Sequence, residues 1–264
     1  MLLWIEFFGS KYRQEECDLS KDKTWGRKQK YDRMFCMKWI DEYDLFLFDF
    51  DGLLVHTEPL HFKAYQKMCS DRGFILPWDF SSYCAIAHAG SENLRLEIYK
   101  LFPLLYQQEP SWTVLYQEKK KAILSILEEG GLQLLPGVEE MLYLLETHQK
   151  RRCVVTHSLS ELTNAIKEQI PALQTIPYWV TREDYKNPKP SPDSYLEAVR
   201  RYGQAGDRVI GFEDTVRGWK SLKAASIRGV VVSSILSKEF KAFLEEQGAT
   251  QMDSFEEILN SSSL

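Results

Sequence analysis

From residue 44 onward, short apolar runs alternate with longer segments in which apolar residues recur every three or four positions. Runs of the first kind are typical of buried strands, and segments of the second kind are typical of amphipathic helices. Nearly all-apolar strands that alternate with helices indicate a parallel sheet covered on both faces. The predicted strands are 45–48, 153–155, 177–180, 208–212 and 229–232, and the predicted helices between them are 138–149, 160–170, 192–202, 215–225 and 238–247.

The strand pattern stops between residues 58 and 132, where only helical periodicity remains. This block follows the first predicted strand directly. It would therefore hang over the carboxyl ends of the strands, where open α/β sheets bind ligands. Extra helices packed on the side of the sheet are the alternative. The helices predicted within the block cover 58–73, 91–102 and 111–131.

We therefore predict an α/β protein with a Rossmann-like parallel-sheet core and an inserted all-helical cap domain. The core would consist of residues 37–57 and 133–264, and the cap of residues 58–132. Residues 1–36 are largely polar and lack a clear period after a short apolar start. We interpret them as an N-terminal appendage and a candidate for disorder, because such segments bury too little apolar surface to fold.

Composition narrows the class of protein. The 264 residues are 44% hydrophobic with a net charge of -5, which allows a substantial core and disfavours nucleic acid as a partner. The five cysteines form no Cys-x-x-Cys pair, so neither a disulfide framework nor a zinc site is expected, and a cytoplasmic location fits best. No apolar run approaches the roughly 20 residues that span a membrane. The sequence does not determine the oligomeric state.

The first predicted strand runs straight into two carboxylates, Asp49 and Asp51, which are followed by Gly52. Residues i and i+2 of an extended chain point to the same side, and glycine permits a tight turn afterwards. Two neighbouring carboxylates can hold a hard cation such as Mg2+, or one can attack an electrophile while the other handles a proton. An Asp-Gly turn that merely leaves a strand is the alternative.

Glu213 and Asp214 follow the strand 208–212 just as Asp49 follows the first strand. Parallel strands end at the same edge of a sheet, so up to four carboxylates are expected to meet there. Like charges a few ångströms apart repel strongly where the dielectric is low, and such a cluster needs a cation. Alternatively, Glu213 and Asp214 only cap the helix that follows them. The predicted ligands of Mg2+ are Asp49, Asp51, Glu213 and Asp214.

Three further residues carry groups that can bind an anion: Lys189, Thr156 and His157. Lys189 lies in a loop stiffened by three prolines, which can hold a positive charge in a fixed place. Thr156 and His157 follow the strand 153–155, where a hydroxyl group meets the free N–H groups of the next helix. Taken alone, Lys189 could instead be a solvated loop lysine, and Thr156 could be an ordinary helix cap.

Together these motifs occur in one order along residues 45–225: Asp49-Phe50-Asp51-Gly52, Thr156 after CVV, Lys189-Pro190-x-Pro192-Asp193, and Gly211-Phe212-Glu213-Asp214. Their order and spacing resemble the haloacid dehalogenase-like superfamily. The chain looks closest to its β-phosphoglucomutase-like branch, which carries a helical cap after the first strand. His61 fits the pattern at the start of that branch's cap.

The resemblance implies a role for each motif. The aspartate matching Asp49 attacks a phosphoryl group and becomes an aspartyl-phosphate, and the one matching Asp51 protonates the leaving oxygen and then activates water. The backbone carbonyl of Asp51 would also reach Mg2+. Because Asp51 must be protonated when the leaving group departs, we expect nearby negative charge and partial burial to raise its pKa. The resemblance further implies that Glu213 and Asp214 bind the metal together with these aspartates. It implies that the phosphate is bound by Thr156, His157 and Lys189.

The resemblance favours phosphate chemistry, because dehalogenases of the superfamily lack an acid at the position of Asp51. The cap segment 84–92 lacks the arginine with which sugar-phosphate mutases grip a second phosphate, although His88 or a lysine from 119–121 could replace it. Otherwise we interpret that lysine run as a solvated helix face. We predict a Mg2+-dependent phosphatase of a small phosphorylated metabolite, with a β-phosphoglucomutase-type mutase or a non-catalytic binding module as alternatives. Substrate contacts are expected from His56, His61 and His88.

Overall fold

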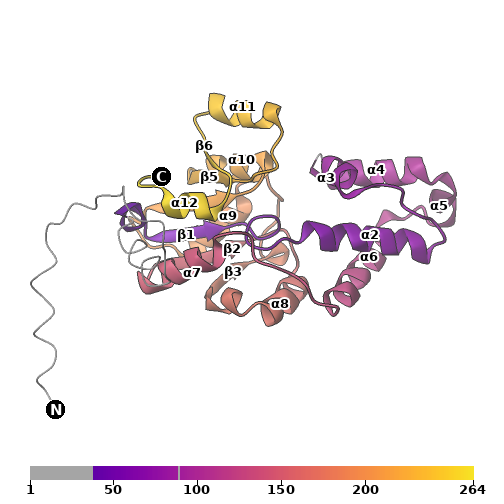
Figure 1. Ribbon diagram of the computed structural model, residues 1–264, viewed down its shortest axis with the longest axis horizontal. Helices are drawn as coiled ribbons and strands as arrows, with labels where there is room; N and C mark the ends of the chain where they lie inside the picture. The colour runs from indigo at the N-terminus through magenta and orange to yellow at the C-terminus, as the bar shows by residue number, and fades with distance from the viewer. Residues whose placement is uncertain (1–37, 89) are drawn as a thin grey trace, which may run out of the picture. The chain divides into compact units, whose positions relative to one another are not determined.

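The computed structural model describes residues 38–88 and 90–264, so the predicted appendage over residues 1–36 lies outside the described part. Its sheet has six parallel strands in the order β3-β2-β1-β4-β5-β6 (Figure 1). The predicted parallel-sheet core is therefore confirmed, and β6 is an addition to the five predicted strands. The strands are β1 Leu45–Phe48, β2 Arg151–Val155, β3 Tyr178–Val180, β4 Val209–Glu213, β5 Arg228–Val232 and β6 Thr250–Met252.

All four residues of β1 are fully buried, because its alternating side chains meet a packed layer on each face of the sheet. Leu45 and Leu47 belong to a cluster with residues of α9 (Asp193–Tyr202) and α10 (Val216–Ala224). On the other face, Phe48 stacks on Phe212 with ring centroids 5.1 Å apart and contacts α12 (Phe255–Asn260). The sequence of β1 is therefore continuously apolar and does not alternate between apolar and polar residues.

The remaining core helices match the periodicity of the sequence. They are α7 Val138–Thr147, α8 Ser160–Gln169 and α11 Lys238–Glu246, and short 3-10 turns cover Lys38–Glu42, Pro171–Thr175 and Arg182–Asp184.

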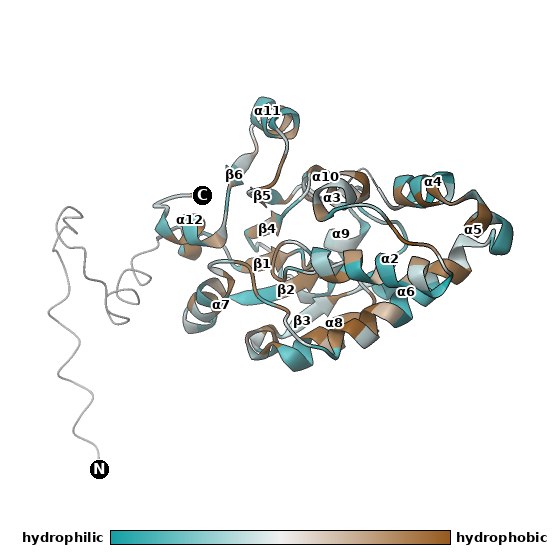
Figure 2. Ribbon diagram, turned by 45° about the vertical axis from the view of Figure 1, so that its right-hand side comes forward, coloured by the Kyte–Doolittle hydropathy of each residue, from teal (hydrophilic) through white to brown (hydrophobic). Residues whose placement is uncertain are grey.

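Among the described residues, the chain between β1 and α7 is entirely without strands that join the sheet. It forms helices α2 to α6, which share a hydrophobic cluster of their own that includes Met68, Cys69 and Ile98. In Figure 2, α2 and α6 carry both teal and brown residues, as amphipathic helices do. The predicted helical insertion is confirmed, whereas its exact boundaries stay a prediction. Its helices are α2 Glu58–Asp71, α3 Phe80–His88, α4 Ser91–Leu101, α5 Pro103–Gln108 and α6 Trp112–Leu127.

The order of the strands determines where a ligand can bind. The chain passes from β1 to β2 on one side and later returns to β4 on the other side of β1. Such a reversal opens a crevice at the carboxyl ends of the two strands that flank it. Within the part of the chain that the structure describes, every helix is too short or too polar to cross a lipid bilayer.

Candidate active site

The carboxyl ends of β1 and β4 bring three carboxylates together. The backbone N–H of Asp49 donates to the carbonyl of Phe212 at 3.0 Å, so pairing with β4 continues one residue beyond β1. Asp49 therefore lies beside Glu213, the last residue of β4. One carboxylate oxygen from each of Asp49, Glu213 and Asp214 lies within 4.8 Å of the other two. Asp49 is 8% exposed and Glu213 only 1%.

Lys189 is the cation that faces this group. Its buried ammonium pairs with Asp49, lies 2.7 Å from Oε1 of Glu213 and donates to the carbonyl of Val155 at 2.9 Å. Tyr195, which is fully buried on α9, donates its hydroxyl to the same Glu213 oxygen, and its ring lies 4.9 Å from the Lys189 nitrogen. Lys189 and Glu213 are thus held from several sides.

The single positive charge of Lys189 does not balance three carboxylates, and the pKa values of two of these carboxyl groups are raised. Burial raises the pKa of Asp49 and that of Asp214, although Lys189 opposes the shift in both. Oxygen ligands grouped at this spacing are the set that Mg2+ prefers, and a divalent cation would balance the remaining charge. The residues present therefore fit the predicted metal, which the carboxylates of Asp49, Glu213 and Asp214 could hold.

Two glycines leave room for these acids. Gly52 has φ +78°, and a Cβ atom there would lie 2.5 Å from Oδ2 of Asp214. At Gly218, in the first turn of α10, a Cβ atom would lie 1.9 Å from the carboxyl carbon of Glu213. The turn at Gly52 was expected from the sequence, whereas the role of Gly218 was not. Its place three residues after Thr215 is the only signal, since the Thr215 side chain caps the helix by accepting from the Gly218 N–H.

The carboxylate of Asp51 stands apart from the three-acid group, contrary to the expectation that four side chains converge. It accepts hydrogen bonds from the hydroxyls of Thr57 and Ser158, both at 2.7 Å, and from that of Thr156 at 3.2 Å. Burial would raise the pKa of Asp51, but the contacts with His61 and these hydroxyls outweigh it and leave the pKa below its ordinary value. The expected upward shift is wrong for the free protein, because donors rather than acids surround the group.

His61 and Lys119 extend this arrangement into the cap. Nε2 of His61 lies 3.7 Å from Asp51, and its Nδ1 lies 2.6 Å from the Lys119 ammonium. Lys119 is only 3% exposed, and burial lowers its pKa to about 7. The interpretation of the whole lysine run as a solvated face is therefore wrong for Lys119. Its position on α6, four residues after the buried Leu115, is the signal that the sequence offered.

The remaining predicted residues occupy different surroundings. Thr156 is fully buried, so its hydroxyl faces Asp51 rather than open space. His157 bonds through Nδ1 to the hydroxyl of Tyr185, and burial lowers its pKa to about 3, with Lys189 contributing. His56 is 47% exposed in its side chain and lies on a separate cavity of about 110 Å³. His88 ends α3, but its side chain lies outside the described residues.

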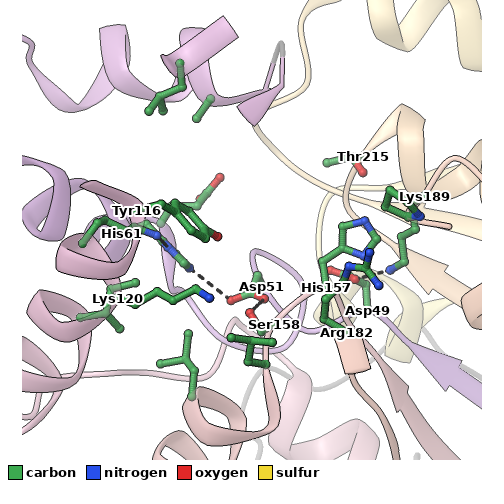
Figure 3. A pocket seen from close by; sticks show the side chains of 18 of the residues that line it. Asp49, Asp51, His61, Tyr116, Lys120, His157, Ser158, Arg182, Lys189 and Thr215 are labelled. Atoms are coloured by element: carbon green, nitrogen blue, oxygen red, sulfur yellow. Dashed lines mark hydrogen bonds and ion pairs between the residues drawn. The ribbon is translucent and has the colours of Figure 1, made fainter. Parts of the chain in front are cut away.

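These groups line one cavity of about 580 Å³ between the strand ends and the cap helices. Figure 3 shows Asp49 and Lys189 on its core side, His61 and Lys120 on its cap side, and Asp51 between them. Arg182 and Arg217 also line it, and both were missed because isolated arginines carry no motif.

A comparison with known protein families identifies the family of the chain that carries this site. The family model described as haloacid dehalogenase-like hydrolase matches residues 46–232. This protein belongs to that family. The resemblance seen in the four motifs is thereby confirmed, as is the expectation of a hydrolase with a helical insertion.

Known proteins similar to this chain include phosphatases and β-phosphoglucomutase-like structures. The "Phosphorylated carbohydrates phosphatase" of Thermotoga maritima is 28% identical over 219 residues, which cover 81% of this chain and 95% of the relative. The structure of CbbY from Rhodobacter sphaeroides with xylulose-(1,5)bisphosphate is 24% identical, has a TM-score of 0.68 and covers 84% of this chain and all of its own. That of β-phosphoglucomutase from Clostridium difficile is 20% identical, with a TM-score of 0.63, and covers 82% and 93% of the two chains. These structural similarities show that this chain has the same fold as those two proteins.

Proposed function

We propose that this protein is a Mg2+-dependent phosphatase that hydrolyses a small phosphorylated metabolite through an aspartyl-phosphate on Asp49. The observation that carries the proposal is the placement of Asp49. Its buried carboxylate shares Lys189 with Glu213 and opens into a cavity of about 580 Å³. The name of the Thermotoga maritima relative, a phosphatase of phosphorylated carbohydrates, supports sugar phosphates as the first substrates to test.

A phosphate ester and an aspartate repel each other, so positive charge must offset both before they react. Lys189 supplies part of that charge at Asp49, and bound Mg2+ would supply Lewis-acid stabilisation of the phosphoryl oxygens. Most of the catalysis of phosphoryl transfer comes from positioning and charge stabilisation of this kind. Asp49 then forms a bond to phosphorus as the bond from phosphorus to the leaving oxygen breaks.

Asp51 lies between the core side and the cap side of the cavity, and we expect the leaving oxygen to depart there. The hydroxyls of Thr57 and Ser158 fix one orientation of its carboxylate, and His61 lies next to it. We assign proton transfer to Asp51: it would take up a proton as the negatively charged ester binds, pass it to the leaving oxygen and regain one from the attacking water. His61 and Lys119 are positioning residues that hold its charge and geometry. The backbone around Thr156 and His157, in the loop between β2 and α8, is assigned to the phosphoryl oxygens.

A phosphate-release assay with sugar phosphates tests the function. We expect turnover with Mg2+, loss of turnover with EDTA, and recovery when Mg2+ is restored. Asp49→Asn should abolish turnover while the thermal unfolding curve stays near that of the wild type. Wild-type activity in Asp49→Asn would overturn the mechanism. An isomer in place of free phosphate, formed only with a bisphosphate activator, would indicate the mutase instead.

A further inference from the structure

The loop that we assign to the phosphoryl oxygens is supported by a second segment, to which the proposed function gives no role. Residues 156–160 follow β2 and enter α8, and residues 181–185 follow β3. Hydrogen bonds join the two segments at every second residue of the first. They run from the Tyr185 hydroxyl to the Thr156 carbonyl at 2.9 Å, from the Arg182 N–H to the Ser158 carbonyl at 3.1 Å, and from the Ser160 N–H to Oε1 of Glu183 at 3.1 Å.

The segment 181–185 is itself held in place. Asp184 accepts a hydrogen bond from the N–H of Thr181 at 2.7 Å and pairs with the guanidinium of Arg201, on α9, at 2.7 Å. The Arg182 guanidinium donates to the carbonyl of Tyr185 at 2.8 Å and lies 5.2 Å from the centre of its ring. The Tyr185 side chain is buried as well, so its hydroxyl has a fixed position.

The Tyr185 hydroxyl makes two hydrogen bonds but has only one proton. One partner is the Thr156 carbonyl, which can only accept, and the other is Nδ1 of His157. The hydroxyl therefore donates to the carbonyl and accepts from Nδ1, so the imidazole carries its proton on Nδ1. Nε2 of His157 is buried and has no hydrogen-bond partner among the described residues. The orientation of the His157 ring, which Figure 3 shows on the core side of the cavity, thus depends on this hydroxyl.

Two backbone N–H groups of this loop are free to bind an anion. The N–H of Ser158 donates to the Thr156 hydroxyl at 2.9 Å. Those of His157 and Leu159 have no partner within the described part of the chain, and both residues line the cavity. The N–H of His157 shares a planar peptide unit with the Thr156 carbonyl, and the N–H of Leu159 shares one with the Ser158 carbonyl. The segment 181–185 therefore holds the two peptide units that carry the free N–H groups.

We propose that Tyr185 is a positioning residue for the phosphoryl group, because its hydroxyl fixes the peptide unit between Thr156 and His157. The N–H of a trans peptide points opposite its carbonyl, so the His157 N–H is directed away from Tyr185 and is available to a phosphoryl oxygen. This inference rests on the proposed phosphatase function. Arg182 holds the next peptide unit through its backbone N–H, which no side-chain substitution removes. Tyr185 is therefore the part of this support that a substitution can test.

Tyr185→Phe removes the hydroxyl and keeps the ring. The Thr156 carbonyl and the His157 imidazole then lose their shared partner, and the peptide unit between them is free to turn. Isothermal titration with inorganic phosphate, in the presence of Mg2+, should show a dissociation constant about tenfold higher, which matches the loss of one hydrogen bond to a charged group. Tyr178→Phe should leave the constant unchanged, because Tyr178 packs against the same hydrophobic cluster and its hydroxyl has no hydrogen-bond partner among the described residues.

Nitrogen NMR of the imidazole provides a readout that a loss of stability alone does not move. In the wild type, the His157 signals, assigned by comparison with His157→Gln, should show a proton on Nδ1 and none on Nε2. Tyr185→Phe should lose this preference, since the acceptor for the Nδ1 proton is gone.

The outcomes separate this proposal from the proposed function. Unchanged phosphate affinity in Tyr185→Phe, even with a lower unfolding temperature, would overturn the positioning role and leave the phosphatase intact. A proton on Nε2 of His157 in the wild type would overturn the role as well. Phosphate binding that depends on Tyr185, in a protein that hydrolyses no phosphate ester with Mg2+ present, would support the role and overturn the phosphatase.

Discussion

Lys189 is the residue on which the charge balance of the site depends. It is buried between Asp49 and Glu213, and its ammonium is the only positive group that pairs with them among the described residues. A buried ion pair is costly to form, but removing one partner is costlier, because it leaves a charge without compensation. The same lysine therefore contributes to stability and, as we propose, to phosphate binding.

Lys189→Met should destabilise the metal-free protein by about 3 kcal/mol, because Asp49 and Glu213 lose their shared cation. Adding Mg2+ should recover part of this loss by supplying positive charge at the same acids. Urea unfolding in EDTA and in Mg2+ measures both effects. Lys186→Met, at an exposed lysine of the same loop, should stay within about 0.5 kcal/mol of the wild type. Equal stability of Lys189→Met and the wild type would contradict the charge argument.

At this scale the sequence predicted the residues that follow strands and missed those that act through packing. Asp49, Glu213 and Asp214 were found because parallel strands end at one edge, so position along the chain implied proximity. Tyr195 and Lys119 were missed because each lies on the buried face of a helix, where an apolar residue is the ordinary expectation. The orientation of Asp51 was also beyond the sequence, because it depends on the hydroxyl of Thr57, a residue of the turn that enters α2.

Lys119 makes a pH-dependent contribution that can be measured. Its pKa is about 7 in the folded protein and about 10.5 in the unfolded chain. Between these values the unfolded chain binds more protons, so the free energy of unfolding rises with pH, by up to about 1.4 kcal/mol per pH unit from this group. Compared with Lys119→Met, the wild type should therefore gain stability from pH 7 to pH 9. Urea unfolding at both values checks this.

The exposed Lys121 provides the control for that experiment. Lys121→Met should show a constant offset from the wild type at each pH, since a solvated lysine titrates alike in both states. A constant offset for Lys119→Met as well would show that its ammonium is not desolvated in solution.

At the scale of elements, helix α10 shows how the acidic group at the strand ends constrains a helix. Glycine inside a helix is ordinarily about 1 kcal/mol less favourable than alanine, so Gly218→Ala would be expected to stabilise α10. Here the added methyl group would lie 1.9 Å from the Glu213 carboxyl carbon. That carboxylate would have to turn away from Asp49 and Lys189, and the steric effect should exceed the gain in helix propensity.

Gly218→Ala should therefore weaken Mg2+ binding at least about tenfold, which is the scale on which residues supporting metal ligands act. Isothermal titration with MgCl2 measures it. Lys220→Ala, at an exposed position of the same helix, should leave the dissociation constant unchanged. A Gly218→Ala protein with normal Mg2+ affinity would mean that Glu213 does not support the metal from its present position.

The elements that the sequence did not predict share a physical cause. Helices α3, α5 and α12 have nine, six and six residues, and strand β6 has three, so none is long enough to establish a period. These pieces form because the longer elements around them supply their packing partners. Strong periodicity predicted α2, α4, α6 and the core helices α7 to α11, and α2, α6 and α9 contribute side chains to the site.

At the scale of the whole molecule, the site is divided between two parts of the chain that fold around different hydrophobic clusters. The acids and Lys189 belong to the core, whereas His61, Lys119 and Tyr116 belong to the helices inserted after β1. The contact of 3.7 Å between His61 and Asp51 joins them. A helical insertion that only covered the site would exclude water, whereas one that supplies His61 would, as we propose, also hold the charge and geometry of Asp51.

His61→Asn distinguishes these two roles. If the insertion supplies a group that controls the protonation of Asp51, kcat should fall about 100-fold while KM changes little, because substrate binding rests on other contacts. The pH dependence of kcat should shift as well, since Asp51 loses its neighbouring imidazole. His56→Asn should have a smaller effect, because His56 lies on the separate, smaller cavity. A rise in KM with kcat and its pH profile unchanged would mean that the inserted helices only enclose the substrate.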